Sequence, residues 1–276
     1  MLARALLLAL LCLPGLGAWA SPPFHAGLPP RAQAEAAAPP DEACLWPGTG
    51  TASADAAALS ALLDRIEALA PQPDLLIAAW QESGVALCLS DQPMEARGYY
   101  EPLSNRIVLR RDLPEGARIA ILIHELRHVE QLGRGFCPSP ELDMQEAARL
   151  VFAMEADAQA IATLYAWQFR QQGDPAAWEA LAEIEHYADI TARFAAAMAE
   201  QDDIGIATAY AFDQWYQDDW RTEAYYISSC SDHLDRLEEE NRLPGYDTLP
   251  EGFFAQFCRL PSGRPYDCGI AGRYRR

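Results

Sequence analysis

Basic side chains are scarce in this sequence, which has 21 of them against 40 acidic side chains and a formal net charge of −19. Such a surface repels the phosphate backbone of DNA and RNA, because like charges are brought together. Anionic membrane surfaces are disfavoured for the same reason. The composition therefore indicates neither a nucleic-acid-binding protein nor a protein that binds membrane surfaces.

The sequence also lacks any CxxC pair, so neither a thiolate zinc site nor thioredoxin-type chemistry has support. After the first 20 residues, no segment is apolar enough to cross a membrane. Histidine is rare, with five in 276 residues. A pair of histidines at the spacing of metal ligands is therefore informative about function.

The first 20 residues have the pattern of a secretory signal peptide. Arg4 supplies a positive charge, residues 5–13 form a short apolar run, and residues 18–20 (AWA) fit a small-x-small cleavage site. The apolar run is too short to anchor the chain across a bilayer. We expect cleavage after Ala20, a periplasmic or secreted protein, and no stable membrane insertion after cleavage.

Six cysteines remain after the signal peptide: Cys44, Cys88, Cys137, Cys230, Cys258 and Cys268. An even number of cysteines in an exported chain predicts disulfides. Proximity along the chain suggests the pair Cys258–Cys268 and leaves the other pairings open.

Hydrophobic periodicity divides the rest of the chain into two parts. Residues 21–54 are rich in proline and alanine and predict a flexible lead-in. Residues 55–276 predict one domain, an α-rich α+β fold with strand-like runs at 85–90 and 106–110. Helical patterns cover 52–70, 74–83, 114–133, 141–172, a helix opened by Asp174-Pro175, 203–229 and 231–242.

Residues 119–131 read IAILIHELRHVEQ and contain an HExxH motif. Because a helix turns about 100° per residue, His124 and His128 share one face and can hold one Zn²⁺. Glu125 is then placed to act as a general base on a water molecule. Two such histidines can also be ordinary surface or core residues, but the full motif rarely arises by chance.

A catalytic zinc site needs a third protein ligand. The metzincin class is excluded, because Gln131 and Arg134 stand where that class has glycine and histidine. Among the remaining histidines, His25 lies in the lead-in, whereas His186 and His233 stay open as ligands. A carboxylate on the next helix is the better candidate.

Three carboxylates on that next helix compete for the role of third ligand, namely Glu146, Glu155 and Asp157. Glu146 is nine residues from Glu155 and Asp157 is two residues from it, so both lie on other faces of the helix. Each carboxylate could also belong to a solvated face. We favour Glu155 because it alone begins an alanine-containing pattern, EADAQAIA.

That pattern resembles the gluzincin metallopeptidases, in which HExxH is followed by a glutamate in an E-x-x-A-(D/N)-x-x-A context. Glu155, Ala158 and Ala162 match, whereas Gln159 stands where the family has an Asp or Asn that hydrogen-bonds a ligand histidine. The resemblance covers roughly residues 75–165 and includes bacterial metallopeptidase families of uncharacterised function. It implies a zincin-like fold and a Zn²⁺ ion held by the two motif histidines and Glu155.

Peptide hydrolysis also needs a donor for the developing oxyanion. The side chains of Tyr225, Tyr226, His186 and His233 can supply one. Tyr99 and Tyr100 lie beside the expected edge strand, which binds the substrate backbone in gluzincins. These two tyrosines could line the cleft or pack within the strand.

The sequence thus predicts an exported zinc-dependent peptidase that acts on a peptide or protein substrate through a metal-activated water. Proteins, peptides and peptidoglycan cross-links all remain open as substrates. One alternative is a non-catalytic exported binding protein on a zincin-like scaffold. Another is an all-helical adaptor with an accidental HELRH sequence.

Overall fold

The structure is a computed structural model that describes residues 43–51, 53–70, 75–92, 96–102 and 104–273. The expected signal peptide, its cleavage site and His25 lie outside these residues.

A four-stranded sheet contains β1 (Ala43–Leu45), β2 (Ala86–Ser90), β3 (Gly98–Glu101) and β4 (Arg106–Arg110). The strand order is β1-β2-β4-β3, with β2 and β4 parallel and each outer strand antiparallel to its neighbour. Side chains alternate between the two faces of the sheet, so Leu87 and Ile107 join the main core while Cys88 and Val108 form a small cluster opposite. Strand β3 is an edge strand.

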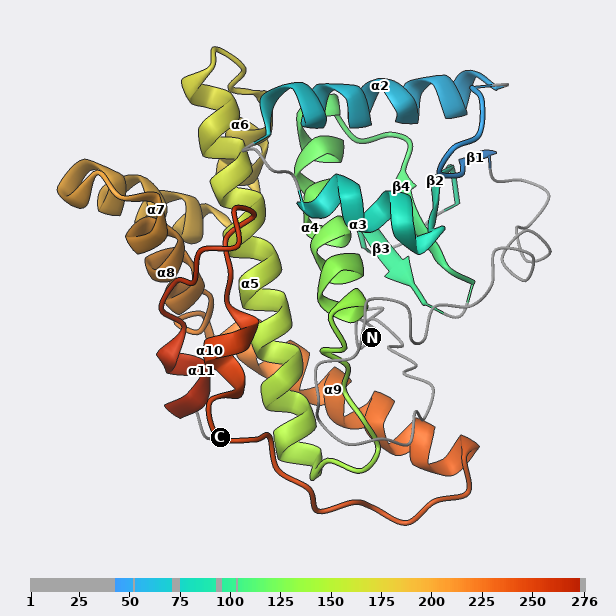
Figure 1. Cartoon of the computed structure of the whole chain (residues 1–276), viewed down its shortest axis with the longest axis vertical. Helices are drawn as coiled ribbons and strands as arrows, with labels where there is room; N and C mark the ends of the chain where they lie inside the picture. Colours follow the sequence, from blue (N-terminus) through green and yellow to red (C-terminus); the bar gives the residue numbers. More distant parts are fainter. Residues whose placement is uncertain (1–42, 52, 71–74, 93–95, 103, 274–276) are drawn as a thin grey trace.

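The helices are α2 (Ala54–Leu69), α3 (Leu75–Ser83), α4 (Glu115–Gly133), α5 (Met144–Gln171), α6 (Ala176–Glu183), α7 (Ala188–Gln201), α8 (Ile204–Trp215), α9 (Asp219–Glu239), α10 (Phe253–Phe257) and α11 (Gly269–Arg273). In Figure 1, α4 and α5 run side by side through the molecule, with the sheet and α3 beside α4. Helices α6 and α8 pack on α5, and α9 crosses its lower end. The predicted α-rich α+β fold with a small sheet is confirmed.

The helices after residue 175 differ from the sequence prediction in two ways. Helix α7 was not expected as a separate element, and α8 ends at Trp215, well before residue 229. Asp218 starts a new helix because its side chain accepts a hydrogen bond from the Arg221 backbone N–H. Helix α9 then continues through residue 230, where the sequence had suggested a break.

Regular structure begins earlier than the expected boundary at residue 55. Strand β1 pairs with β2, and a disulfide joins Cys44 to Cys88 across this pair. Residues 43–45 of the expected lead-in therefore belong to the sheet.

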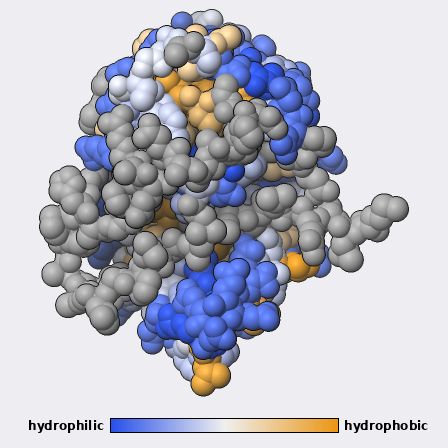
Figure 2. Space-filling view, turned by 90° about the vertical axis from the view of Figure 1, so that its right-hand side faces the viewer, coloured by the Kyte–Doolittle hydropathy of each residue, from blue (hydrophilic) through white to orange (hydrophobic). Residues whose placement is uncertain are grey.

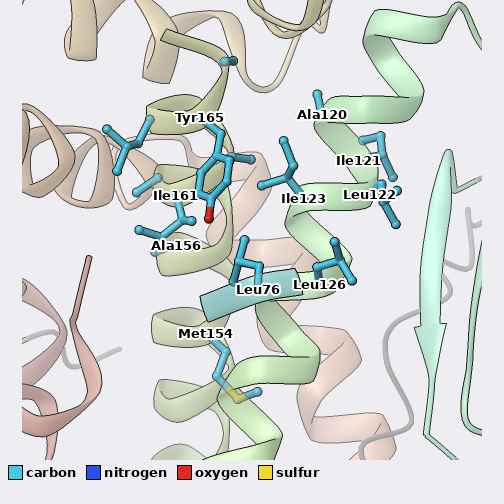
Figure 3. Close-up of a cluster of buried hydrophobic side chains, with 14 of the residues drawn as sticks. Leu76, Ala120, Ile121, Leu122, Ile123, Leu126, Met154, Ala156, Ile161 and Tyr165 are labelled. Atoms are coloured by element: carbon cyan, nitrogen blue, oxygen red, sulfur yellow. The ribbon is translucent and has the colours of Figure 1, made fainter. Parts of the chain in front are cut away.

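Helices α4 and α5 form the centre of the hydrophobic core. Figure 3 shows Ile123 on α4 pointing toward α5, where Tyr165 faces it, while Leu122 points away from α5. Many α5 side chains are alanines with no exposed surface, for example Ala156, Ala158, Ala160 and Ala162. Such small side chains let two helix backbones approach closely, which brings polar groups of α4 and α5 within reach of one another.

Strand β3 packs very closely on α4. A Cβ atom added at Gly98 would lie 2.7 Å from the Ile121 Cγ2 atom and 2.8 Å from the Leu109 Cδ2 atom. Only glycine fits this close approach, which places the edge strand next to the helix that carries HELRH.

Two disulfides join described residues, Cys44–Cys88 and the predicted Cys258–Cys268. Cys230 is a free thiol, so the expectation that all six cysteines pair fails at this residue. Figure 2 shows the face on the right-hand side of Figure 1 as largely hydrophilic where described residues cover it, with small separate hydrophobic areas. Among the described residues, none of the helices combines the length and hydrophobicity needed to cross a bilayer.

Candidate metal centre

The HELRH residues lie in the buried middle of α4. The helix starts after Pro114, and Glu115 in its first turn interacts favourably with the helix dipole. His124 is 7% exposed and His128 is 0% exposed, so both imidazoles are removed from bulk water. Polar groups buried in this way need partners, and α5 supplies them.

The structure brings three of the proposed site residues together between α4 and α5, namely His124, His128 and Glu155. The two Nε2 atoms lie 3.1 Å apart. The Glu155 carboxylate lies 3.4 Å from each of them, with Oε2 toward His124 and Oε1 toward His128. Burial alone would raise the pKa of Glu155, but His128 and His124 outweigh burial and lower that pKa.

This donor set fits a tetrahedral metal ion. Ligand atoms about 2.0–2.1 Å from a tetrahedral zinc ion are about 3.3 Å from one another. The observed separations of 3.1 and 3.4 Å agree with that spacing. Two imidazoles and one carboxylate are also a usual ligand set for catalytic zinc. The residues present therefore fit a divalent metal such as zinc.

Glu125 lies beside these three residues and is also buried. Its Oε2 atom has no hydrogen-bond partner among the described residues, and the carboxylate accepts a hydrogen bond from the backbone N–H of Tyr100 on β3. Loss of hydration raises the pKa of Glu125 to about 7. A carboxyl group with such a pKa can both accept and return a proton near neutral pH.

The protonation of His128 is fixed by Gln131. The amide nitrogen of Gln131 donates to Asp157 Oδ2 at 2.7 Å and to the Met154 carbonyl at 3.0 Å. The amide oxygen of Gln131 must then face His128 Nδ1, 2.9 Å away. Nδ1 therefore carries the hydrogen and donates it, which leaves the Nε2 lone pair free for a metal.

His124 has a comparable partner in Gln159, whose side chain hydrogen-bonds the imidazole. Gln159 is 1% exposed, and its Nε2 atom has no partner among the described residues. Glutamine thus makes the contact that the gluzincin resemblance assigns to Asp or Asn, at the cost of one unpaired amide nitrogen.

Two tyrosines border the ligands on the side of Glu155. The Tyr225 hydroxyl hydrogen-bonds the Glu155 carboxylate, and Tyr187 hydrogen-bonds Tyr225. Burial and the charge of Glu155 raise the pKa of Tyr225 well above its usual value. Burial also raises the pKa of Tyr187 to about 12. Both hydroxyls therefore keep their protons and can donate hydrogen bonds.

The rival carboxylates have other partners. Glu146 pairs with Arg149 at 2.6 Å and accepts the Leu249 N–H at 3.1 Å, which ties the C-terminal segment to α5. Asp157 is fully buried and pairs with Arg127 at 2.6 Å. Neither carboxylate belongs to the group formed by the two motif histidines and Glu155.

The remaining candidates from α9 and its surroundings lie elsewhere. His233 interacts with Arg236 and with Asp143 at the start of α5. His186 lies 3.7 Å from Asp218 and stacks on Trp220. Tyr226 hydrogen-bonds Cys230.

The two tyrosines of β3 pack within the sheet region. The Tyr100 side chain is buried and donates to the Asn105 side chain at 3.3 Å, whereas Tyr99 packs on the opposite face of the sheet. It is the backbone of Tyr100 that reaches Glu125.

The sequence reasoning missed Gln131 and Tyr187 as members of this site. Gln131 could have been recognised, because it follows His128 by three residues and so lies on the same helix face. Tyr187 is brought in by α7, and no spacing in the sequence signals its position.

Comparison with known proteins agrees with this geometry. Residues 32–268 match the model of a family described as "Putative metallopeptidase family (DUF6782)", and the chain belongs to this family. No curated protein and no solved structure matches the chain.

Proposed function

We propose that this protein is an exported zinc-dependent peptidase. The observation that carries the proposal is the buried group of His124, His128 and Glu155, whose donor atoms have the spacing of a tetrahedral metal site. Membership of a metallopeptidase family supports peptide or protein as the substrate class.

The three ligands would hold the zinc ion, which would act as a Lewis acid and lower the pKa of a water molecule to about 7. Glu125 takes a proton from the attacking water and passes it to the leaving amine. Its buried carboxylate is suited to both steps because its pKa is raised to about 7.

The substrate would lie along the edge strand β3, beside Glu125. An edge strand offers unpaired backbone groups to an extended peptide. The Tyr100 N–H, which contacts Glu125, fixes the distance between this edge and the general base. Tyr187 offers a protonated hydroxyl for the developing oxyanion, whereas the Tyr225 hydroxyl donates to Glu155 and would help to hold this ligand in place.

Export is supported by the two disulfides, because such bonds form and persist in oxidising compartments. The signal-peptide pattern of residues 1–20 points the same way.

The test compares wild type with Glu125→Gln, using elemental analysis for zinc and mass spectrometry of a mixed peptide digest for cleavage. We expect about one zinc per chain in both proteins and cleavage by wild type only. Glu115→Gln, on an exposed residue of the same helix, is the control and should cleave normally. Zinc-loaded wild type that cleaves no peptide would favour a non-catalytic binding protein. Folded wild type that takes up no zinc would contradict the peptidase proposal and leave the non-catalytic binding protein.

A further inference from the structure

Asp157 is the centre of a buried polar network that no step of the proposed hydrolysis uses. Its carboxylate accepts Arg127 Nε at 2.6 Å and Arg127 Nη2 at 3.0 Å. It also accepts Gln131 Nε2 at 2.7 Å and the Tyr266 hydroxyl at 2.5 Å. Arg127 and Asp157 are both 0% exposed. Four donor atoms from three residues, two on α4 and one in the C-terminal segment, therefore fix one carboxylate in position.

The network leads directly to the metal ligand His128. An ionised carboxylate is an acceptor only, so Asp157 forces Gln131 to turn its amide nitrogen toward α5. That orientation presents the amide oxygen to His128 Nδ1. The position of Asp157 thus sets both the ring orientation and the tautomer of His128, which is connected to it by two hydrogen bonds through Gln131.

The C-terminal segment enters the network at two points. The Tyr266 hydroxyl donates to Asp157, and the Arg259 carbonyl accepts Arg127 Nη2 at 2.8 Å. A disulfide between Cys258 and Cys268 closes this segment, which we call the C-terminal loop (residues 258–268). Within the loop, the Tyr266 N–H donates to the Cys258 carbonyl at 3.3 Å. The disulfide therefore holds both contacts in one rigid unit.

We propose that Tyr266 and Arg127 are positioning residues for the metal centre, acting through Asp157 and Gln131 on His128. The C-terminal loop is then a structural part of the centre. The inference rests on the proposed function, because it requires that the ligand group binds a metal.

A purely structural network would stabilise the fold without changing the metal site. The two roles are separated by Tyr266→Phe, which removes one hydroxyl and keeps the ring. Tyr216→Phe is the matched control, because Tyr216 is also buried and packs on Phe212 as Tyr266 does.

Zinc affinity is measured by competition with a chromophoric chelator, and the visible spectrum of the cobalt(II)-loaded protein reports on ligand geometry. We expect about 10-fold weaker zinc binding for Tyr266→Phe, at the low end of the range for partners of ligand histidines. The cobalt(II) spectrum should change as well. Tyr216→Phe should match wild type in both measurements.

Unchanged zinc affinity and an unchanged cobalt(II) spectrum in Tyr266→Phe would overturn the inference and leave the proposed function intact. Wild type that binds no zinc would overturn both. Gln131→Leu removes the side chain that connects Asp157 to His128. We expect this variant to bind zinc about 10- to 100-fold more weakly than wild type. Wild-type affinity in Gln131→Leu would overturn the inference even if Tyr266→Phe failed to fold.

Discussion

Gln159 hydrogen-bonds His124 from the next turn of α5 after Glu155, while its own amide nitrogen has no partner among the described residues. One side chain therefore both orients a ligand and leaves a buried donor unpaired. The first contact should favour metal binding, and the second should cost stability.

Replacing Gln159 separates these two effects. We expect Gln159→Ala to weaken zinc binding about 10- to 100-fold, because His124 loses the partner that orients its ring. Chelator competition measures the affinity. Gln168→Ala, two and a half turns further along α5, is the control and should bind zinc as wild type does. Equal affinities in all three proteins would remove Gln159 from the metal centre.

The assignment of Glu155 as the third ligand predicts a larger loss. Glu155→Gln keeps the shape of the side chain but removes its charge, and zinc binding should weaken by more than about 100-fold, beyond the effect of outer partners. Glu146→Gln, another buried carboxylate on α5, should keep its zinc. If elemental analysis found zinc in Glu155→Gln but not in Glu146→Gln, the ligand assignment would be wrong.

The two ligand histidines should respond differently to pH. Burial would lower the pKa of His124, but Glu155 and Glu125 outweigh burial and raise it. Burial lowers the pKa of His128 to about 4. Zinc requires neutral imidazole, so only a proton on His124 competes with zinc between about pH 5 and pH 6.5.

Zinc affinity should therefore fall as pH falls through this range, with a slope of about one proton per zinc ion. Calorimetric titration in buffers of different ionisation enthalpy measures the proton count. The Glu125→Gln variant, measured in parallel, shows any proton that Glu125 contributes. A slope near two in that variant would mean that His128 is also protonated.

The Arg127–Asp157 pair should matter for stability as well. We expect Asp157→Asn to lower the free energy of unfolding by about 3 kcal/mol, because a buried guanidinium loses its counter-charge. Urea unfolding of the zinc-free protein measures the change without any contribution from metal. The exposed pair Arg110–Asp112 supplies the comparison, and Asp112→Asn should leave stability nearly unchanged. Equal stability of the Asp157→Asn variant and wild type would show that the pair is neutral.

The sequence predicted those parts of the fold that depend on local pattern. The strands at β2 and β4 and the helices α2 to α5 follow from periodicity and from helix-starting residues such as Pro114. The break between α8 and α9 was predicted at the wrong position. The helical periodicity continues through this region, whereas Asp218 caps the start of α9 and so separates the two helices. Strand β1 was missed because its three residues gain stability only from pairing with β2.

The residues of the site also fall into those that local sequence patterns predict and those that they do not. His124, Glu125 and His128 follow from spacing on one helix, and the ligand glutamate from an alanine pattern that resembles a known family. Tyr187 and Tyr266 reach the site through tertiary packing, and neither has a fixed spacing from the motif. Asp157 was weighed only as a ligand, whereas the structure pairs it with Arg127, a residue inside the motif itself.

Tyr266 follows Asp157 by 109 residues in the sequence. During synthesis, α4 and α5 leave the ribosome long before the C-terminal loop does. A growing chain thus holds all three ligands while Asp157 still lacks its contacts with the loop. On the network proposed above, the metal centre is complete only when residues 258–268 have been synthesised and the Cys258–Cys268 bond has closed, so the order of synthesis sets the time at which the site forms.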